Sequence, residues 1–256
     1  QRYFKGYGGL FRKSLRSAHK VFVQDETSEG LLRAIGLDQV EIAGDTRFDR
    51  VADVAENARS FDLIRQFKGG DLLVILGSSW EPEEKMMAEF MSKSDYSFKL
   101  IIAPHEVEES HLVEIESRFE ATKRYSQIIA GELEECRVLI IDNVGMLNKL
   151  YRDADVAFVG GGFGKGLHNT LEAAVFGVPL LIGPNHHQFR EAVDLVEVGG
   201  AFVVEDDRQL HHDLNALLVD GELRHRAGEA CRNYVGSRLG ATELIFSEVK
   251  RILGAG

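Results

Sequence analysis

The stretch VAFVGGGFGKGLHNTLEAA, residues 156–174, joins a short apolar run to a turn with five glycines and then to a helix-like segment. An apolar run without polar alternation is typical of a strand buried on both faces, as in a parallel sheet. Glycines allow a tight turn, and the residues after them have the composition of a helix. The stretch therefore predicts a strand–turn–helix unit.

Similar apolar runs recur along the chain, with helix-like stretches between them. The runs lie at residues 21–23, 40–44, 72–77, 99–103, 138–142, 179–183 and 201–204. Alternating strands and helices favour right-handed βαβ crossovers and a doubly wound, Rossmann-like parallel α/β sheet. We expect one such domain over residues 21–236, after a basic linker at 1–20 and before a C-terminal helix at 237–256.

The overall charge limits the classes of ligand. The chain has 256 residues, 44% of them hydrophobic, and a formal net charge of −11, which argues against a nucleic-acid groove lined by clustered cations. Residues 1–20 differ, because they contain basic residues but no Asp or Glu: Arg2, Lys5, Arg12, Lys13, Arg16 and Lys20. Two interpretations remain open for this segment, a surface near anionic lipid and a solvated linker helix.

The cysteines and the ends of the chain bear on its location. Cys136 and Cys231 match no C-x-x-C spacing, so nothing requires an oxidising compartment, and we expect an intracellular protein. The sequence contains neither a run of about 18 apolar residues nor a recognisable signal peptide. Because Gln1 is not an initiator, we expect the chain to be a fragment.

The histidine pairs do not favour a metal site. His186–His187 and His211–His212 are adjacent in sequence, so their rings would diverge on a helix. We therefore expect no metal, although the first pair follows a strand end and could line a cleft. We also expect no cofactor, because the glycine spacing at 160–166 does not fit a dinucleotide fingerprint.

Each strand-to-helix turn is a candidate site, because open α/β sheets bind ligands beyond the carboxyl ends of their strands. The glycine-rich turn matches neither G-x-G-x-x-G nor G-x-x-x-x-G-K-[ST]. Free N–H groups at a helix start near His168 and Asn169 would nevertheless face a phosphate, and Glu172 would accept hydrogen bonds from sugar hydroxyls. The alternative is that the glycines only let strand and helix pack tightly.

Three further turns carry weaker signals. Ser78 and Ser79 end a strand and would hold a phosphate or carboxylate, although Ser78 and Glu81 also have the spacing of a capping box. Pro104 and His105 follow another strand end, where the backbone would border a base or ribose. The segment 142–147 leads into a short helix, and its main-chain groups would contact a nucleobase.

Together these turns resemble the donor-binding half of the 3-deoxy-D-manno-octulosonic acid (Kdo) transferases, which add Kdo to the lipid A precursor of lipopolysaccharide. The resemblance covers about residues 10–204 in the family's order. The matching stretches are FVQDETSEGLLRAIG, GDTRFDRV, GSSWEPEE, DNVGMLNKLYRDADVAFVGGGFGKGLHNTLEAA and GVPLLIGPNHHQFREA.

The resemblance implies a GT-B glycosyltransferase, in which two Rossmann-like domains face each other across a cleft. This chain would be the C-terminal domain, which binds the donor substrate CMP-Kdo, and it would be soluble. A glutamate general base, the lipid A precursor site and the membrane-associated segment would belong to an N-terminal domain upstream of Gln1. The parent enzyme would work at the cytoplasmic face of the inner membrane, with inversion at the sugar.

The resemblance also implies a set of donor-site residues. Many members have Pro-Arg-His where this chain has Pro104–His105, and an acidic residue at the position of Met146, so side-chain roles differ at those places. The expected donor-binding residues are Arg47, Ser78, Ser79, Pro104, His105, Val144, Gly145, Met146, Gly162, Gly164, Lys165, Asn169, Thr170, Leu171 and Glu172.

Two other functions remain open at this level. A UDP-sugar transferase or epimerase on the same scaffold would use Glu172 and the glycine-rich turn equally well. The chain by itself would alternatively be a binding module that holds CMP without activity, while the parent enzyme performs transfer.

Overall fold

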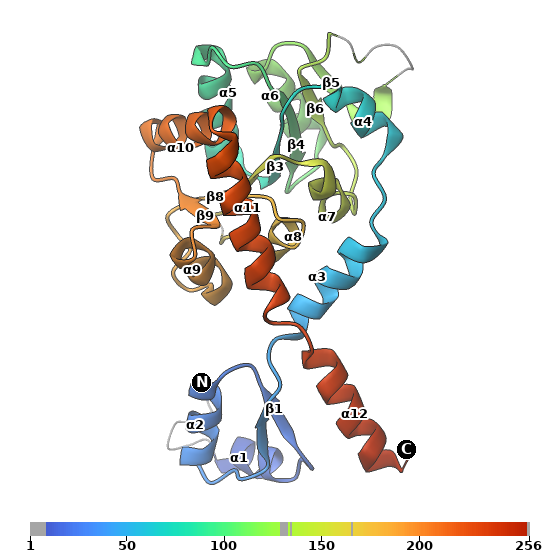
Figure 1. The fold of residues 1–256 in the computed structure, drawn as a ribbon, viewed down its shortest axis with the longest axis vertical. Coiled ribbons are helices and arrows are strands. Elements are labelled where there is room, and N and C mark those ends of the chain that lie inside the picture. Colours follow the sequence, from blue (N-terminus) through green and yellow to red (C-terminus); the bar gives the residue numbers. More distant parts are fainter. Residues whose placement is uncertain (1–8, 129–132, 134, 165, 255–256) are drawn as a thin grey trace. The chain divides into compact units, whose positions relative to one another are not determined.

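The computed structural model describes residues 9–128, 133, 135–164 and 166–254 (Figure 1). The chain forms two compact units, which are described separately. The small unit combines Gln1–Arg50 with Ser237–Gly256, and the sheet unit is Val51–Gly236. The division therefore differs from the predicted ranges, because residues 21–50 lie in the small unit.

The sheet unit contains a seven-stranded parallel sheet with the order β5-β6-β4-β3-β7-β8-β9. Six of the predicted apolar runs form its strands, whereas the polar edge strand β5 gives no apolar signal. The strands are β3 (Leu73–Ser79), β4 (Lys99–Pro104), β5 (Thr122–Arg124), β6 (Val138–Ile140), β7 (Val156–Val159), β8 (Leu180–Ile182) and β9 (Ala201–Val203).

Helices connect these strands, as the alternating pattern predicts. The helix α3 (Thr46–Asn57) crosses the boundary between the two units. The others are α4 (Asp62–Lys68), α5 (Glu81–Lys93), α6 (Glu109–Arg118), α7 (Leu147–Leu150), α8 (Leu171–Ala174), α9 (Arg190–Glu197), α10 (Asp207–Val219) and α11 (Gly221–Gly236), with 3-10 turns at Tyr125–Gln127 and Tyr151–Asp153.

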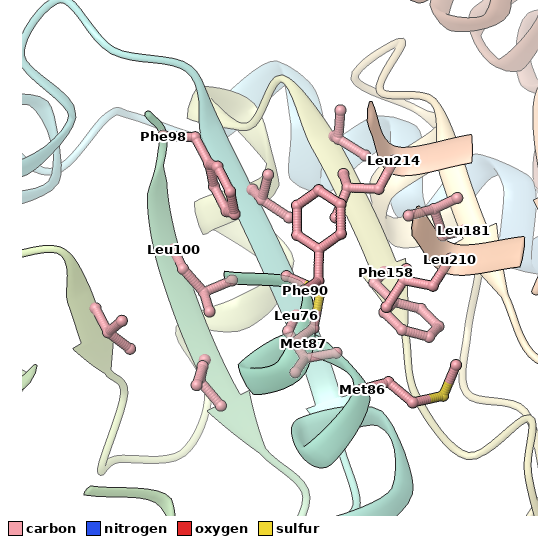
Figure 2. Close-up of a cluster of buried hydrophobic side chains, with 14 of the residues drawn as sticks. Leu76, Met86, Met87, Phe90, Phe98, Leu100, Phe158, Leu181, Leu210 and Leu214 are labelled. Carbon is pink, nitrogen blue, oxygen red and sulfur yellow. The ribbon is translucent and has the colours of Figure 1, made fainter. Parts of the chain in front are cut away.

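The central strands are buried on both faces, as a parallel sheet requires. Val74 and Leu76 of β3 point to one face, where α5, α6 and α10 contribute the other half of a hydrophobic core. Figure 2 shows Met86, Met87 and Phe90 of α5 in one cluster with Leu210 and Leu214 of α10 and with Leu76, Leu100, Phe158 and Leu181 of the sheet. This core fixes the carboxyl ends of β3, β4 and β7 relative to one another.

The order in which the chain adds strands to the sheet reverses at β3. From β3 the chain proceeds to β4, β5 and β6 on one side, and it then returns to β7 on the other side. Such a switch of strand order leaves a crevice at the carboxyl edge, where open α/β sheets bind their ligands. We therefore expect a ligand site at the carboxyl ends of β3, β4 and β7.

The small unit is built on a βαβ element. Its described elements are α1 (Gly9–Arg16), β1 (Val21–Val23), α2 (Glu26–Ala34), β2 (Val40–Ile42) and α12 (Ala241–Leu253), and β1 pairs in parallel with β2. The Asp49 carboxylate accepts the N–H groups of Gly240 and Thr242 at 2.6 and 2.7 Å. These bonds satisfy donors at the start of α12 and lower the pKa of Asp49 despite its partial burial.

Part of the basic segment contacts its own chain. Arg16 donates a hydrogen bond to the carbonyl of Ile35 at 3.0 Å, and Lys20 pairs with Glu41 and Glu248. Arg2 and Lys5 lie outside the described residues. These three contacts fit a structural role for Arg16 and Lys20, and the relation of residues 1–20 to a membrane stays a prediction. No helix in the described part of the chain is long and apolar enough to cross a membrane.

Candidate functional site

The structure places most of the predicted donor-site residues at the carboxyl edge of the seven-stranded sheet. Ser78 and Ser79 end β3, Pro104 ends β4, and the glycine-rich turn follows β7. The His105 N–H donates to the Ser79 carbonyl at 3.0 Å, which joins the first two turns. Parallel strands bring all these ends to one edge, as the sequence pattern predicts.

Three aromatic rings connect the turns after β3, β4 and β7. The Trp80 indole Nε1 donates a hydrogen bond to Nε2 of His168 at 3.3 Å. The His105 ring stacks on Trp80 with centroids 4.6 Å apart, and it lies 4.5 Å from the His168 ring. We call Trp80, His105 and His168 the ring cluster. The sequence analysis identified His105 and the backbone near His168, but not Trp80.

The ring cluster determines the protonation state of His168. Burial lowers the pKa of His168 below its ordinary value of 6.5, and the neighbouring His105 lowers it further. Because Nε2 accepts the indole N–H, the neutral ring must carry its proton on Nδ1. His168 is therefore a neutral donor at physiological pH, at the edge where the turns converge.

Three consecutive glycines after β7 are required by backbone packing. A Cβ at Gly160 would lie 2.3 Å from the carbonyl oxygen of Ser78, and one at Gly161 would lie 2.2 Å from that of Gly166. A Cβ at Gly162 would lie 2.6 Å from the Gly183 backbone. At these three positions the close approach is to other parts of the chain. Tight packing, the alternative interpretation of the glycines, therefore holds there.

The tip of the same turn is open. Gly164 is exposed, and a Cβ there would have no atom within 4 Å. Of the two glycines of this turn predicted to bind the donor, Gly164 lies where a ligand has room. Gly162 is packed against Gly183, the residue after β8. Lys165, which follows the tip, lies outside the described residues.

The two serines at the end of β3 have different environments. The Ser79 side chain is fully buried, and its hydroxyl donates to Glu84 Oε1 at 2.8 Å, so this hydroxyl already has a partner. Ser78 interrupts the register between β3 and β4 with a φ of 51°, in the left-handed region that favours glycine. Its half-buried side chain has no partner in the described part of the chain.

The predicted capping box between Ser78 and Glu81 is wrong. The helix α5 begins at Glu81 with Trp80 as its N-cap, and the Glu83 carboxylate accepts the Trp80 N–H at 3.2 Å. The physical reason is that the strand continues through Ser79, which shifts the helix start by two residues. A carboxylate three residues after the cap still accepts the N–H of the cap residue, but the pair is Trp80 and Glu83.

Two adjacent buried carboxylates follow this cap. Glu83 also accepts the Gly161 N–H at 2.7 Å, and burial raises the pKa of Glu83 above 4.5. Glu84 accepts Nε2 of His111 at 3.0 Å and Arg118 at 3.1 Å. Burial opposes the charge on His111, but the Glu84 carboxylate outweighs it and raises the pKa of His111 above 6.5.

The helix after the glycine-rich turn is shorter than predicted. The sequence predicts a helix that starts near His168 and Asn169, but the α-helix α8 covers only Leu171–Ala174. A helix of one turn has few aligned peptide dipoles, so the argument from a helix N-terminus facing a phosphate is not supported. Local side-chain bonds to the backbone replace regular helix at its start.

Polar side chains nevertheless gather at the start of α8. Asn169 accepts the Leu171 N–H at 3.2 Å and donates to Glu172 Oε1 at 3.2 Å. The Thr170 side chain is 1% exposed, and its hydroxyl oxygen is a buried atom without a hydrogen-bond partner. Glu172 is half-buried beside Tyr151, whose pKa is raised by burial and by the Glu172 charge.

The turn after β6 also lies at the carboxyl edge. Val144 is 87% exposed, Gly145 has a φ of 93°, and Met146 directly precedes α7. An apolar side chain exposed to this degree is available for contact with a planar apolar group. Arg47, by contrast, lies in the small unit, where its guanidinium pairs with Asp45 at 2.7 Å.

No metal centre is formed within the described residues, where no group of three or more His, Cys, Asp and Glu side chains could hold an ion. The rings of His186 and His187 lie with centroids 4.2 Å apart at 41°, and Nδ1 of His186 is buried without a partner. The expectation of a reaction without metal stays a prediction.

Comparisons with curated proteins connect the chain to one group. The 3-deoxy-D-manno-octulosonic acid transferase of Bordetella pertussis is 26% identical over 262 residues, which cover 96% of this chain and 60% of the relative. That of Chlamydia trachomatis serovar D is 30% identical over 172 residues, covering 64% of this chain and 39% of the relative. The chain thus spans less than two thirds of the length of these relatives. No protein-family profile matches it.

Solved structures share the fold. The C-terminal CMP-Kdo binding domain of WaaA from Acinetobacter baumannii is 23% identical with a TM-score of 0.60, over 75% of this chain and 99% of that domain. UDP-N-acetylglucosamine 2-epimerase is 16% identical with a TM-score of 0.58, over 86% of this chain and 57% of the enzyme. The comparisons confirm the resemblance to Kdo transferases and the Rossmann-like α/β fold.

Proposed function

We propose that this chain is the donor-binding part of a Kdo transferase and binds CMP-Kdo at the carboxyl edge of its seven-stranded sheet. The observation that carries this proposal is the convergence of the turns after β3, β4 and β7 through the ring cluster, at the switch of strand order. The resemblance to Kdo transferases supports CMP-Kdo over other nucleotide sugars.

Polar groups at the start of α8 would recognise the ribose and phosphate. In this proposal Glu172 accepts hydrogen bonds from ribose hydroxyls, while its bond to Asn169 holds the carboxylate in place. The unpartnered Thr170 hydroxyl gains a partner when the donor binds, which removes the cost of a buried unpaired oxygen. Leu171 contributes its buried side chain to the base of the site.

The donor carries a phosphate and a carboxylate, and neutral groups here would bind them. His168 donates from Nδ1, Ser78 from its hydroxyl, and the open backbone at Gly164 leaves room for the anion. The Val144–Met146 turn borders the cytosine. Preorganised neutral donors stabilise developing phosphate charge without a metal, which fits the expectation that the reaction needs none.

The transfer itself would belong to the longer enzyme. An acceptor hydroxyl of the lipid A precursor attacks the anomeric carbon of Kdo while the bond to CMP breaks, and a general base takes the hydroxyl proton. Attack opposite the leaving group inverts the sugar. We propose that the base is a glutamate of a second domain, at the cytoplasmic face of the inner membrane, and that the chain alone binds but does not transfer.

Calorimetric titration of the chain with CMP tests the donor site. We expect CMP to bind, and Asn169→Ala and Glu172→Ala each to weaken its affinity by about tenfold, the effect of losing a hydrogen bond to a charged group. Glu89→Gln, on the exposed side of α5, is the control and should leave the affinity unchanged. The assignment fails if both site variants bind CMP like the unaltered chain.

A UDP-sugar enzyme is the second candidate, because the epimerase likeness has a TM-score of 0.58. Parallel titrations with UMP and UDP separate the two, since a cytidine site should prefer CMP over UMP. A turnover assay with CMP-Kdo and a lipid A precursor tests whether the chain alone binds the donor without transferring Kdo. Product from the chain alone would show that its own residues suffice for transfer.

A further inference from the structure

Glu83 connects two parts of the candidate site that are distant in sequence. Its side chain is 1% exposed, although it is a carboxylate in the first turn of α5. One oxygen accepts the Trp80 N–H at 3.2 Å, and the other accepts the Gly161 N–H at 2.7 Å. Gly161 follows Glu83 by 78 residues and belongs to the glycine-rich turn after β7.

Helix capping explains only one of these two bonds. A carboxylate three residues after an N-cap commonly accepts the N–H of the cap residue, and this accounts for the contact with Trp80. The bond to Gly161 reaches another strand connection and lies in the buried part of the structure. The neighbouring carboxylate does not share this role, because Glu84 accepts from Ser79, His111 and Arg118.

The Gly161 N–H has few alternatives. Gly161 has a φ of 88°, and its Cα faces the Gly166 carbonyl oxygen so closely that no Cβ would fit. Gly160 and Gly162 on either side are packed against the backbone at Ser78 and Gly183. A buried N–H held in this way needs an acceptor at one point in space, and Glu83 supplies it.

Both bonds of Glu83 lead to the ring cluster. Trp80, whose backbone Glu83 holds, donates its indole N–H to His168. Gly161 lies close to the His168 ring, since a Cβ there would lie 3.0 Å from His168 Cδ2. One buried carboxylate thus fixes both the donor and the acceptor of the bond that closes the cluster.

We propose that Glu83 is a positioning residue, whose carboxylate holds Trp80 and the glycine-rich turn in the arrangement that binds the donor. This inference rests on the proposed function for its ligand, but the anchoring of the turn is independent of it. Desolvation works against a charged carboxyl at this place, and this is why the pKa of Glu83 is raised. The two hydrogen bonds to the carboxylate offset part of that cost.

Glu83→Gln in the full chain tests the proposal. Glutamine keeps the volume, but its amide group presents N–H to one of two backbone donors, so one bond must be lost. Glu83→Ala removes both acceptors. The matched control is Glu81→Gln, an exposed carboxylate in the same helical turn. Thermal unfolding first establishes that each variant is folded.

Two measurements are then compared between the variants and the unaltered chain. Hydrogen exchange and the amide proton shift of Gly161, followed by NMR, report on the turn without any ligand. Calorimetry with CMP reports on the donor site. We expect Gly161 exchange to accelerate by about tenfold or more in Glu83→Ala, with an upfield shift of its amide proton and a CMP affinity about tenfold weaker. The exchange of the β3 amides should be unchanged in the Glu83 variants. Glu81→Gln should change neither the Gly161 exchange nor the CMP affinity.

The outcomes separate this inference from the proposed function. If Gly161 keeps its shift and exchange rate in Glu83→Ala, which has neither acceptor, the anchoring role is wrong. If Gly161 is released while the CMP affinity stays constant, the link from the turn to donor binding is wrong. If the unaltered chain does not bind CMP, the proposed donor fails, and the Gly161 measurements alone decide whether Glu83 anchors the turn.

Discussion

The indole Nε1 of Trp80 lies 3.3 Å from Nε2 of His168, although 88 positions separate the two residues in the sequence. Trp80 caps α5 at the end of β3, and His168 follows the glycine-rich turn after β7. Because β3 and β7 are neighbours in the sheet, this bond spans the place where the strand order reverses. The relationship makes Trp80 part of the candidate site.

Trp80 should report ligand binding, because it is the only tryptophan in the chain. We expect CMP to change its fluorescence with the same midpoint that calorimetry gives. Trp80→Phe keeps an aromatic ring but loses the indole donor, and CMP affinity should fall by about three- to tenfold, the effect of one neutral hydrogen bond. Saturating CMP that leaves the fluorescence unchanged would place the ligand elsewhere.

His168 and His111 should titrate on opposite sides of pH 6.5. The pKa of His168 is lowered, so its contribution to stability is present above about pH 6.5 and is lost as the pH falls. The pKa of His111 is raised, so its contribution is present below pH 6.5 and is lost as the pH rises through the raised value. NMR titration of the imidazoles measures both midpoints, and His168→Gln and His111→Gln assign the signals. A midpoint of His168 above that of His111 would contradict this prediction.

Two glycines of the same turn should respond differently to alanine. Gly162→Ala places a Cβ 2.6 Å from the Gly183 backbone, and we expect the free energy of unfolding to fall by about 2 kcal/mol or more. Gly164→Ala adds a methyl group in open space, and its effect should stay within about 0.5 kcal/mol. Denaturant unfolding measures both. Equal losses of stability would show that the tip of the turn is also packed.

The two serines after β3 provide a second matched pair. Ser79→Ala leaves the buried Glu84 with one donor fewer, which should cost about 1–2 kcal/mol of unfolding free energy. Ser78→Gly removes the strain of a positive φ and should raise stability by about 0.5–1 kcal/mol, while it weakens CMP binding by removing a hydroxyl. A Ser78→Gly variant that binds CMP normally would remove this hydroxyl from the donor site.

Most strands were predictable because a strand in a parallel sheet leaves a short apolar run in the sequence. The eight apolar runs of the sequence correspond to β1, β2, β3, β4, β6, β7, β8 and β9. Among the strands in the described part of the chain, only β5, a short polar edge strand, left no such pattern. The placement of the partly buried β1 and β2 in a sheet of their own was not predictable, because an apolar run indicates a strand but not which strands it pairs with.

The glycine-rich turn shows where local reasoning stops. Its composition indicated a close approach to the backbone. A glycine permits such an approach equally by a ligand or by another part of the chain, so the composition does not tell which of the two is present. The structure shows the chain at Gly160, Gly161 and Gly162, and open space at Gly164. In the same way, a carboxylate after a helix cap is visible in the sequence, whereas its bond to Gly161 is not.

By itself, the sequence determined the class of fold and the edge of the sheet at which the candidate turns gather, because the strand pattern and the turns that follow it are local. The tertiary structure alone decided that Trp80, His105 and His168 meet, that Ser79 is occupied by Glu84, and that Glu83 holds the turn. These contacts depend on the order of strands in the sheet. That order is set by packing summed over the whole core, and no short stretch of residues records it.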